Sequence, residues 1–245
     1  MRIILTEQQY DALMFHERLA CLLQEDSSFK KKDLIRKLIK QCLIAGMAVG
    51  AIITAINQSN LPAKEKLEMA ELAKADSIAL SERMKAEKAK SDSIYQTKVN
   101  AVRNYMAKAL ENQNYSLQST KLKPETLVKA SMETGFDLPF MMAVAHQESC
   151  FGATPRAKKT GSVFSEGLYD NGHNAKTYSD PNESVYGFIN LLNNDYLRDG
   201  KNLSDLLNPG NFVNYNGHRY ASDSNYENKI KNLRNRIVRN YPELS

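Results

Sequence analysis

The residue best placed to do chemistry is Glu148, a carboxyl group that follows an uncharged apolar stretch. Residues 138–145 are all apolar and predict a buried helix, with Asp137 as its N-cap and Pro139 in its first turn. Glu148 would lie at the end of this helix, where partial burial and the negative end of the helix dipole both raise the pKa of a carboxyl group. A carboxyl group that keeps its proton near neutral pH can act as a general acid, for example toward a glycosidic oxygen. The alternative is an ordinary solvated glutamate at a helix end.

Three segments in the second half of the chain resemble the characteristic blocks of one enzyme family. Residues 145–152 (AHQESCFG) resemble the pattern A-x-x-E-S-G-(W/F)-G, and residues 178–184 (YSDPNES) resemble Y-x-S-x-x-E-S. Residues 220–226 (YASDSNY), with Lys229 and Ile230, resemble Y-A-T-D-P-x-Y-x-x-K-I. These patterns, in this order, are those of glycoside hydrolase family 73, the endo-N-acetylglucosaminidases that include flagellar and autolysin-type hydrolases.

The resemblance covers residues 122–245 and carries expectations for fold and function. It implies a mainly α-helical, lysozyme-like catalytic domain that cleaves the glycan strands of peptidoglycan at N-acetylglucosamine. It also implies that Glu148 is the proton donor and that Tyr220 lines the cleft near the scissile bond. Tyr226, in the third segment, is expected either to stack on sugars or to fill the core. The chain departs from the family pattern at Cys150, where the family has glycine.

A second carboxylate would decide the stereochemistry of such a reaction. A nucleophile lies about 5 Å from the acid, whereas a base that activates water lies about 6.5 to 9.5 Å away. The loop over residues 163–172 offers Glu166 and Asp170, although Asp170 also belongs to an Asp-Asn-Gly turn signal. Phe164 and Tyr169 of the same loop would suit a sugar-lined cleft. If neither carboxylate is close enough, the substrate's own 2-acetamido group can serve as the nucleophile.

The first half of the chain predicts helices that precede this domain. Residues 1–41 predict short amphipathic helices, residues 42–57 an apolar helix, and residues 58–121 a long helical stalk and linker. The long helix is expected because Ala51 to Thr134 contains no glycine and is rich in Ala, Lys and Glu. Such an arm could hold the protein in a homo-oligomer or a larger assembly.

The apolar run from Cys42 to Ile56 has two interpretations. It carries no charge, and Gly46 and Gly50 have the small-xxx-small spacing of membrane helices that pack closely. The run is shorter than the roughly 20 residues that a bilayer core requires. Both a membrane segment and a buried or oligomeric helix therefore remain open.

The distribution of charge and the spacing of histidines and cysteines argue against nucleic-acid binding and against a metal site. The net charge of +5 comes entirely from residues before Leu122, since the rest of the chain has as many acidic as basic residues. A neutral second half argues against nucleic acid as a partner. The histidines and cysteines lack the spacing of metal sites, so we expect no metal and no cofactor. The seven residues are His16, His146, His173, His218, Cys21, Cys42 and Cys150.

Three functional hypotheses follow from these features. The first is a peptidoglycan hydrolase located in the cell envelope, in the periplasm or cell wall, either membrane-anchored or carried by a bacteriophage particle. The second is a muramidase or lytic transglycosylase on the same fold, because a single essential glutamate also suits intramolecular cleavage. The third is a structural component of a phage virion or a secretion apparatus that uses a lysozyme-like domain to open the wall locally.

Overall fold

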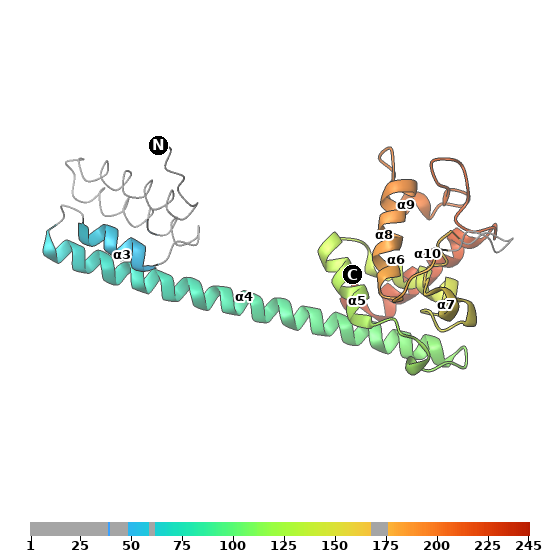
Figure 1. The fold of residues 1–245 in the computed structure, drawn as a ribbon, viewed down its shortest axis with the longest axis horizontal. Coiled ribbons are helices and arrows are strands. Elements are labelled where there is room, and N and C mark those ends of the chain that lie inside the picture. The colour runs from blue at the N-terminus through green and yellow to red at the C-terminus, as the bar shows by residue number, and fades with distance from the viewer. Residues whose placement is uncertain (1–38, 40–48, 59–61, 168–175) are drawn as a thin grey trace. The chain divides into compact units, whose positions relative to one another are not determined.

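A computed structural model gives the fold of most of the chain (Figure 1). It describes residues 39, 49–58, 62–167 and 176–245. The chain divides into two compact units, Met1–Ser91 and Asp92–Ser245, which are considered separately below.

In the described part of the first unit, helix α3 (Val49–Gln58) lies beside the first turns of helix α4 (Ala63–Glu111) (Figure 1). Helix α3 contributes buried Ile52 and Ile56, and the first turns of α4 contribute buried Met69 and Ala73. The predicted apolar helix over residues 42–57 is described only from Val49 onward, and the amphipathic helices predicted for residues 1–41 lie outside the described residues, except for Ile39. In the described part of the chain, no helix combines the length and the apolar character needed to cross a bilayer.

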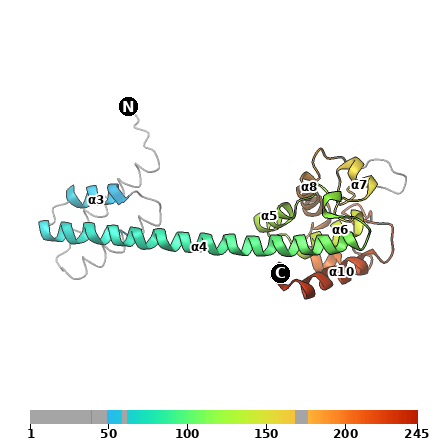
Figure 2. The ribbon, with the colours of Figure 1, turned by 90° about the horizontal axis from the view of Figure 1, so that it is seen from below.

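Helix α4 (Ala63–Glu111) is a single helix of 49 residues, and it confirms the predicted long helix. The second unit begins within this helix, well before the sequence-based domain boundary at Leu122. The last turns of α4 lie beside the other helices of the second unit (Figure 2). They supply buried Val102, Met106 and Leu110 to the core of that unit, which explains the earlier start. The end of the predicted stalk is therefore part of the folded domain.

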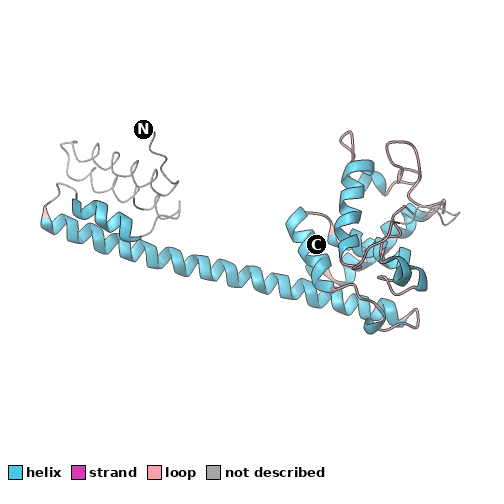
Figure 3. Ribbon diagram, viewed as in Figure 1, coloured by secondary structure: helices cyan, strands magenta, loops and turns pink. Residues whose placement is uncertain are grey.

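The second unit is built from helices, and no strand occurs in the described residues (Figure 3). The expectation of a mainly α fold is confirmed. After α4 the helices are η1 (Leu117–Ser119), α5 (Pro124–Thr134), α6 (Leu138–Ser149), α7 (Pro155–Thr160), α8 (Glu183–Leu191), η2 (Leu192–Tyr196), α9 (Leu203–Leu206), α10 (Tyr226–Asn240) and η3 (Pro242–Leu244).

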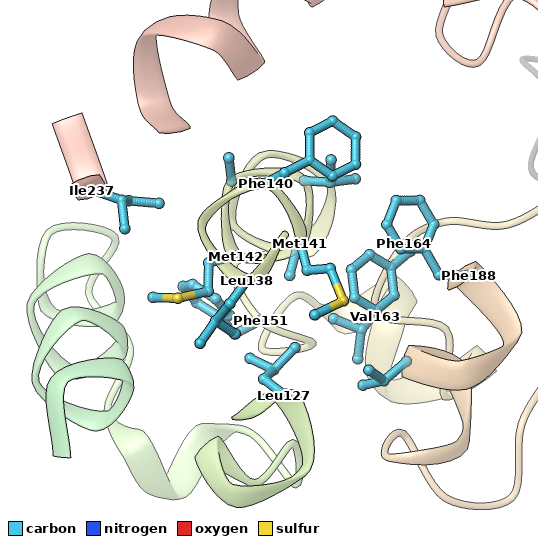
Figure 4. Close-up of a cluster of buried hydrophobic side chains, with 14 of the residues drawn as sticks. Leu127, Leu138, Phe140, Met141, Met142, Phe151, Val163, Phe164, Phe188 and Ile237 are labelled. Atoms are coloured by element: carbon cyan, nitrogen blue, oxygen red, sulfur yellow. The ribbon is translucent and has the colours of Figure 1, made fainter. Parts of the chain in front are cut away.

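Helix α6 forms the centre of the second unit (Figure 4). Every residue from Leu138 to Ala145 is buried, because this stretch has no polar face to present to water. Asp137 caps the helix as predicted, since its carboxylate accepts a hydrogen bond of 2.7 Å from the backbone N–H of Phe140. The preceding helix α5 ends at Gly135, which adopts the left-handed conformation (φ 71°) of a helix C-cap.

Helix α10 packs along α6 in the opposite direction. Arg234, in the second half of α10, donates two hydrogen bonds of 2.5 and 3.1 Å to Asp137 at the start of α6. Tyr226, the first residue of α10, contacts Glu148 at the end of α6. The two helices are thus joined at both ends, and the junction with Glu148 is the candidate site.

The junction at Asp137 gives a stability test. We expect Asp137→Ala to lower the free energy of unfolding by about 2 kcal/mol or more, since it removes both the helix cap and the partner of Arg234. Asp137→Asn retains the cap and should cost about half as much. Urea denaturation of the full chain measures both values.

The exposed ion pair of Arg83 with Glu87 (3.2 Å) supplies the control. Glu87→Ala should change stability by less than about 0.5 kcal/mol, because exposed pairs contribute little. Equal losses for Asp137→Ala and Glu87→Ala would contradict the structural role of Asp137.

Candidate active site

Glu148 lies in the last turn of α6 and is partly buried. The hydroxyl of Tyr226 donates a hydrogen bond of 2.5 Å to its Oε1 atom. Burial is the largest influence on the carboxyl group and raises its pKa, while hydrogen bonds from Tyr226 and the Ser165 side chain act in the opposite direction. The net effect is a raised pKa, in the direction that a proton donor needs.

The chain turns sharply after Glu148. Cys150, Phe151 and Gly152 have φ values of 47°, 59° and 83°, all in the left-handed region that favours glycine. Cys150 adopts this conformation although it has a side chain. The left-handed turn that glycine favours therefore forms here with a cysteine. Two hydrogen bonds of the Ser149 hydroxyl hold the turn, one from the N–H of Gly152 (2.7 Å) and one to the carbonyl of Val163 (2.6 Å).

The bond to Val163 fastens a second loop beside the end of α6, and this loop carries Glu166. The Glu166 side chain is 2% exposed. Its Oε2 atom accepts a hydrogen bond of 2.7 Å from the Tyr178 hydroxyl and lies 3.5 Å from the Lys176 ammonium. Its Oε1 atom is buried and has no hydrogen-bond partner among the described residues. Burial raises the pKa of Glu166, and Tyr178 and Lys176 oppose that shift.

Glu148 and Glu166 line the same small pocket. The other lining residues are mostly hydroxyl-bearing or basic: Thr154, Arg156, Ala157, Thr160, Ser162 and Ser165. The cavity volume is about 20 Å³, which is room for one water molecule and too little for a sugar ring. The structure therefore brings the two predicted carboxylates to one cavity.

The predicted sugar-binding aromatic residues lie mainly in the core. Phe164 is 0% exposed and stacks on Phe188 with ring centroids 4.2 Å apart, so its prediction as a substrate contact is wrong in this conformation. Tyr226 is also buried, so of the two roles expected for it, sugar stacking and core packing, the structure shows core packing, and its hydroxyl holds Glu148. Tyr220 is partly buried, and its hydroxyl donates a hydrogen bond of 2.5 Å to the carbonyl of Phe164.

Two further predicted site residues, Tyr169 and Asp170, lie outside the described residues. His146, two residues before Glu148, does not line the pocket. Its Nδ1 atom lies 2.7 Å from the Tyr105 hydroxyl, and burial together with Arg236 lowers the pKa of the imidazole. This histidine packs against α4, as expected for a structural residue.

Several positioning residues were not predicted from the sequence. Tyr178 belongs to one of the three family-like segments, but nothing in the segment indicates that it binds Glu166. Arg219 forms an ion pair with the buried Glu227, and its Nη2 atom donates to both carboxylate oxygens at 2.8 and 2.9 Å. This pair ties the loop that carries Tyr220 to α10. Nothing in residues 219–227 of the sequence indicates this pair.

A separate and larger groove, about 610 Å³ in volume, shares no residue with the pocket at Glu148. It is lined by Arg103, Leu117, residues 120–124 and residues 179–182. Some of its polar side chains already have partners. Asn182 bonds the backbone N–H of Lys123 and the side chains of Thr126 and Asp180, and Arg103 pairs with Glu125.

Comparisons with known proteins and the search for metal sites give no further assignment. No protein-family model, curated protein or solved structure matches the chain. Within the described ranges, no group of three or more His, Cys, Asp or Glu side chains comes together as a metal site.

The raised pKa of Glu148 gives a pH-dependent stability test. Below the ordinary glutamate pKa of 4.5, the carboxyl is protonated in both the folded and the unfolded chain and has no effect. As the pH rises above that value the unfolded chain ionises first, so stability is lost until the folded pKa has been passed. We expect Glu148→Gln to remove this loss.

The measurement is the free energy of unfolding of wild type and Glu148→Gln between pH 4 and pH 8. The variant should gain stability relative to wild type as the pH rises, by about 1.4 kcal/mol for each unit of pKa elevation. Glu183→Gln, which changes an exposed glutamate of the same unit, is the control for the removal of one carboxylate. A constant difference between wild type and Glu148→Gln would rule out the raised pKa.

Proposed function

We propose that the second unit is a glycosidase that cleaves the glycan strands of peptidoglycan, with Glu148 as the general acid. The observation that carries the proposal is the environment of this carboxyl group: it is partly buried, its pKa is raised, and Tyr226 fixes one of its oxygens. A proton donor held in one orientation at the end of a buried helix is what cleavage of a glycosidic bond requires.

The substrate class rests on the three segments that resemble glycoside hydrolase family 73. Two of them meet at the proposed acid, since Glu148 comes from residues 145–152 and Tyr226 from residues 220–226. The remaining segment, residues 178–184, supplies Tyr178, which binds Glu166 at the same pocket. Their convergence supports the assignment to peptidoglycan, cleavage at N-acetylglucosamine and a lysozyme-like fold as parts of the proposal.

In the proposed reaction Glu148 gives its proton to the glycosidic oxygen as the bond from that oxygen to the anomeric carbon breaks. The bonding electrons leave with the oxygen, and positive charge develops on the sugar ring. Glu166 is too deeply buried to reach the anomeric carbon as a nucleophile. Attack by the substrate's own 2-acetamido group, followed by water, is the route that needs no second exposed carboxylate.

The burial of Glu166 also favours a second candidate on the same fold, a lytic transglycosylase. In that reaction a hydroxyl group of the muramyl sugar attacks its own anomeric carbon, so that one accessible glutamate suffices. Product analysis separates the two reactions. An N-acetylglucosaminidase leaves reducing N-acetylglucosamine ends, and a muramidase leaves reducing muramyl ends. A lytic transglycosylase leaves anhydro-muramyl ends.

The proposed place of action is the cell envelope. Delivery there by a membrane anchor, a phage particle or a secretion apparatus is part of the same proposal, as is assembly through the long helix α4. The exposed apolar side chains of α4 support an assembly role: Leu67, Ile78, Met84 and Ile94.

The test of the function is cleavage of purified peptidoglycan by the full chain. We expect Glu148→Gln to reduce the rate by about 100- to 10,000-fold, because general acid catalysis contributes a factor of that size. Binding to the wall, measured by co-sedimentation, should persist because the glutamine has the same shape.

Glu243→Gln, which changes an exposed glutamate of the same unit outside the three family-like segments, is the control and should retain wild-type cleavage. If Glu148→Gln cleaved peptidoglycan as fast as wild type, the assignment of the acid would fail. If the wild-type chain bound the wall and produced no new glycan ends, the third hypothesis, a structural component, would replace the enzymatic one.

A further inference from the structure

The unpartnered oxygen of Glu166 is the feature that the proposed function leaves unexplained. A buried carboxylate oxygen without a hydrogen bond is costly, and native proteins satisfy nearly all such atoms with protein groups or ordered water. The partners of Glu166 among the described residues, Tyr178 and Lys176, both lie at Oε2. Oε1 therefore needs another partner.

The pocket shared with Glu148 has room for that partner. Its volume of about 20 Å³ fits one water molecule. The lining hydroxyls, Thr154, Thr160, Ser162 and Ser165, supply the several polar contacts that a buried water requires. A single water in this position would lie between two carboxyl groups.

We infer that Glu148 and Glu166 form one acid pair, joined by a single water in this pocket, and that Glu166 resupplies the proton that Glu148 delivers. The resupply step rests on the proposed glycosidase function, whereas the pairing itself does not. Glu166 is thus a positioning residue that acts through Glu148 and does not touch the substrate.

The hydrogen bonds determine which atoms carry the proton. Since Oε2 of Glu166 accepts from Tyr178, the proton of the neutral acid belongs on Oε1. Oε1 of Glu148 accepts from Tyr226, so the proton exchange with the substrate and the water is assigned to its other oxygen. In this pair, Oε1 of Glu166 is therefore the proton donor, and the oxygen of Glu148 that does not bind Tyr226 is the proton acceptor.

The proton balance of one cycle is simple. Glu148 loses its proton to the departing glycosidic oxygen and becomes a carboxylate. Glu166 gives its Oε1 proton to the pocket water, which passes one of its own protons to Glu148. Tyr178 and Lys176 stabilise the Glu166 carboxylate. In hydrolysis, the water that adds to the anomeric carbon gives a proton to Glu148, as the proton that Glu148 carries passes back through the pocket water to Glu166.

The other titratable groups around Glu148 and Glu166 are compatible with this pairing of the two carboxyl groups. Arg156 of α7 lines the pocket, and Lys176 is the cation next to Glu166. Tyr220 lies close enough to both carboxylates that each raises the pKa of its phenol. Tyr178 and Tyr226, the two hydrogen-bond donors to the pair, remain neutral in the same range because both phenol pKa values are raised.

The test is a carboxyl NMR titration of the full chain labelled with ¹³C-glutamate. It compares wild type with Glu148→Gln, Glu166→Gln and the exposed control Glu183→Gln, and the missing signals assign the two carboxyl groups. Because two negative charges that share a cavity disfavour each other, removing either carboxyl should lower the pKa of the other by the same amount. The control should move neither.

Independent titrations of Glu148 and Glu166 would overturn the inference, whatever the enzyme does. Should Glu166→Gln fail to fold, Tyr178→Phe serves instead. It removes a bond that lowers the pKa of Glu166, so Glu166 should keep its proton to higher pH, and the pKa of Glu148, relieved of that neighbouring charge, should fall. A rise confined to Glu166 would contradict the coupling.

Kinetics separate this inference from the proposed function. With a proton relay, Glu166→Gln should lower kcat without changing KM, by less than the roughly 100-fold minimum expected for Glu148→Gln. A wild-type chain that cleaves no glycan but shows coupled titrations would refute the function and leave the pair standing. Restoration of the Glu166→Gln rate by azide would instead make Glu166 a direct nucleophile or base, against the inference.

Discussion

The hydrogen bond from Tyr226 to Glu148 joins the end of one buried helix to the start of another, and the geometry of the candidate site depends on it. It can form only because α6 and α10 pack in opposite directions. The pair of Asp137 with Arg234 fixes the other end of the same helix pair. Movement of α10 along α6 would break both junctions, so the orientation of the acid is set by the core.

Burial of α6 also explains the chemistry of the site. A helix that is apolar on every face must be covered by other parts of the chain. Its last turn therefore places the carboxyl group of Glu148 at the edge of the hydrophobic core. The reduced solvation raises the pKa of Glu148, while Tyr226 limits the shift. The loop bonded to the turn after α6 places a second, more deeply buried carboxyl group at the same pocket. The same burial that raises the pKa of Glu148 makes its ionisation unfavourable to the stability of the fold.

The elements with strong local signals could be predicted from the sequence. The apolar run after Asp137 indicated α6, the lack of glycine indicated α4, and Glu148 was placed correctly at a helix end. Long-range pairings could not be predicted. Aromatic composition does not distinguish a cleft from a core, which is why Phe164 was misassigned. The start of the second unit within α4 was missed because its apolar residues there follow no clean heptad.

The most direct test of the central claim is a crystal structure of the Glu148→Gln variant with a bound glycan fragment of peptidoglycan. The account expects the glycosidic oxygen within about 3 Å of the side chain at position 148, on the side away from Tyr226. It also expects the sugars to lie outside the pocket shared with Glu166, which is too small for them. A glycan bound only in the groove lined by residues 120–124 and 179–182, with no contact at position 148, would contradict the account.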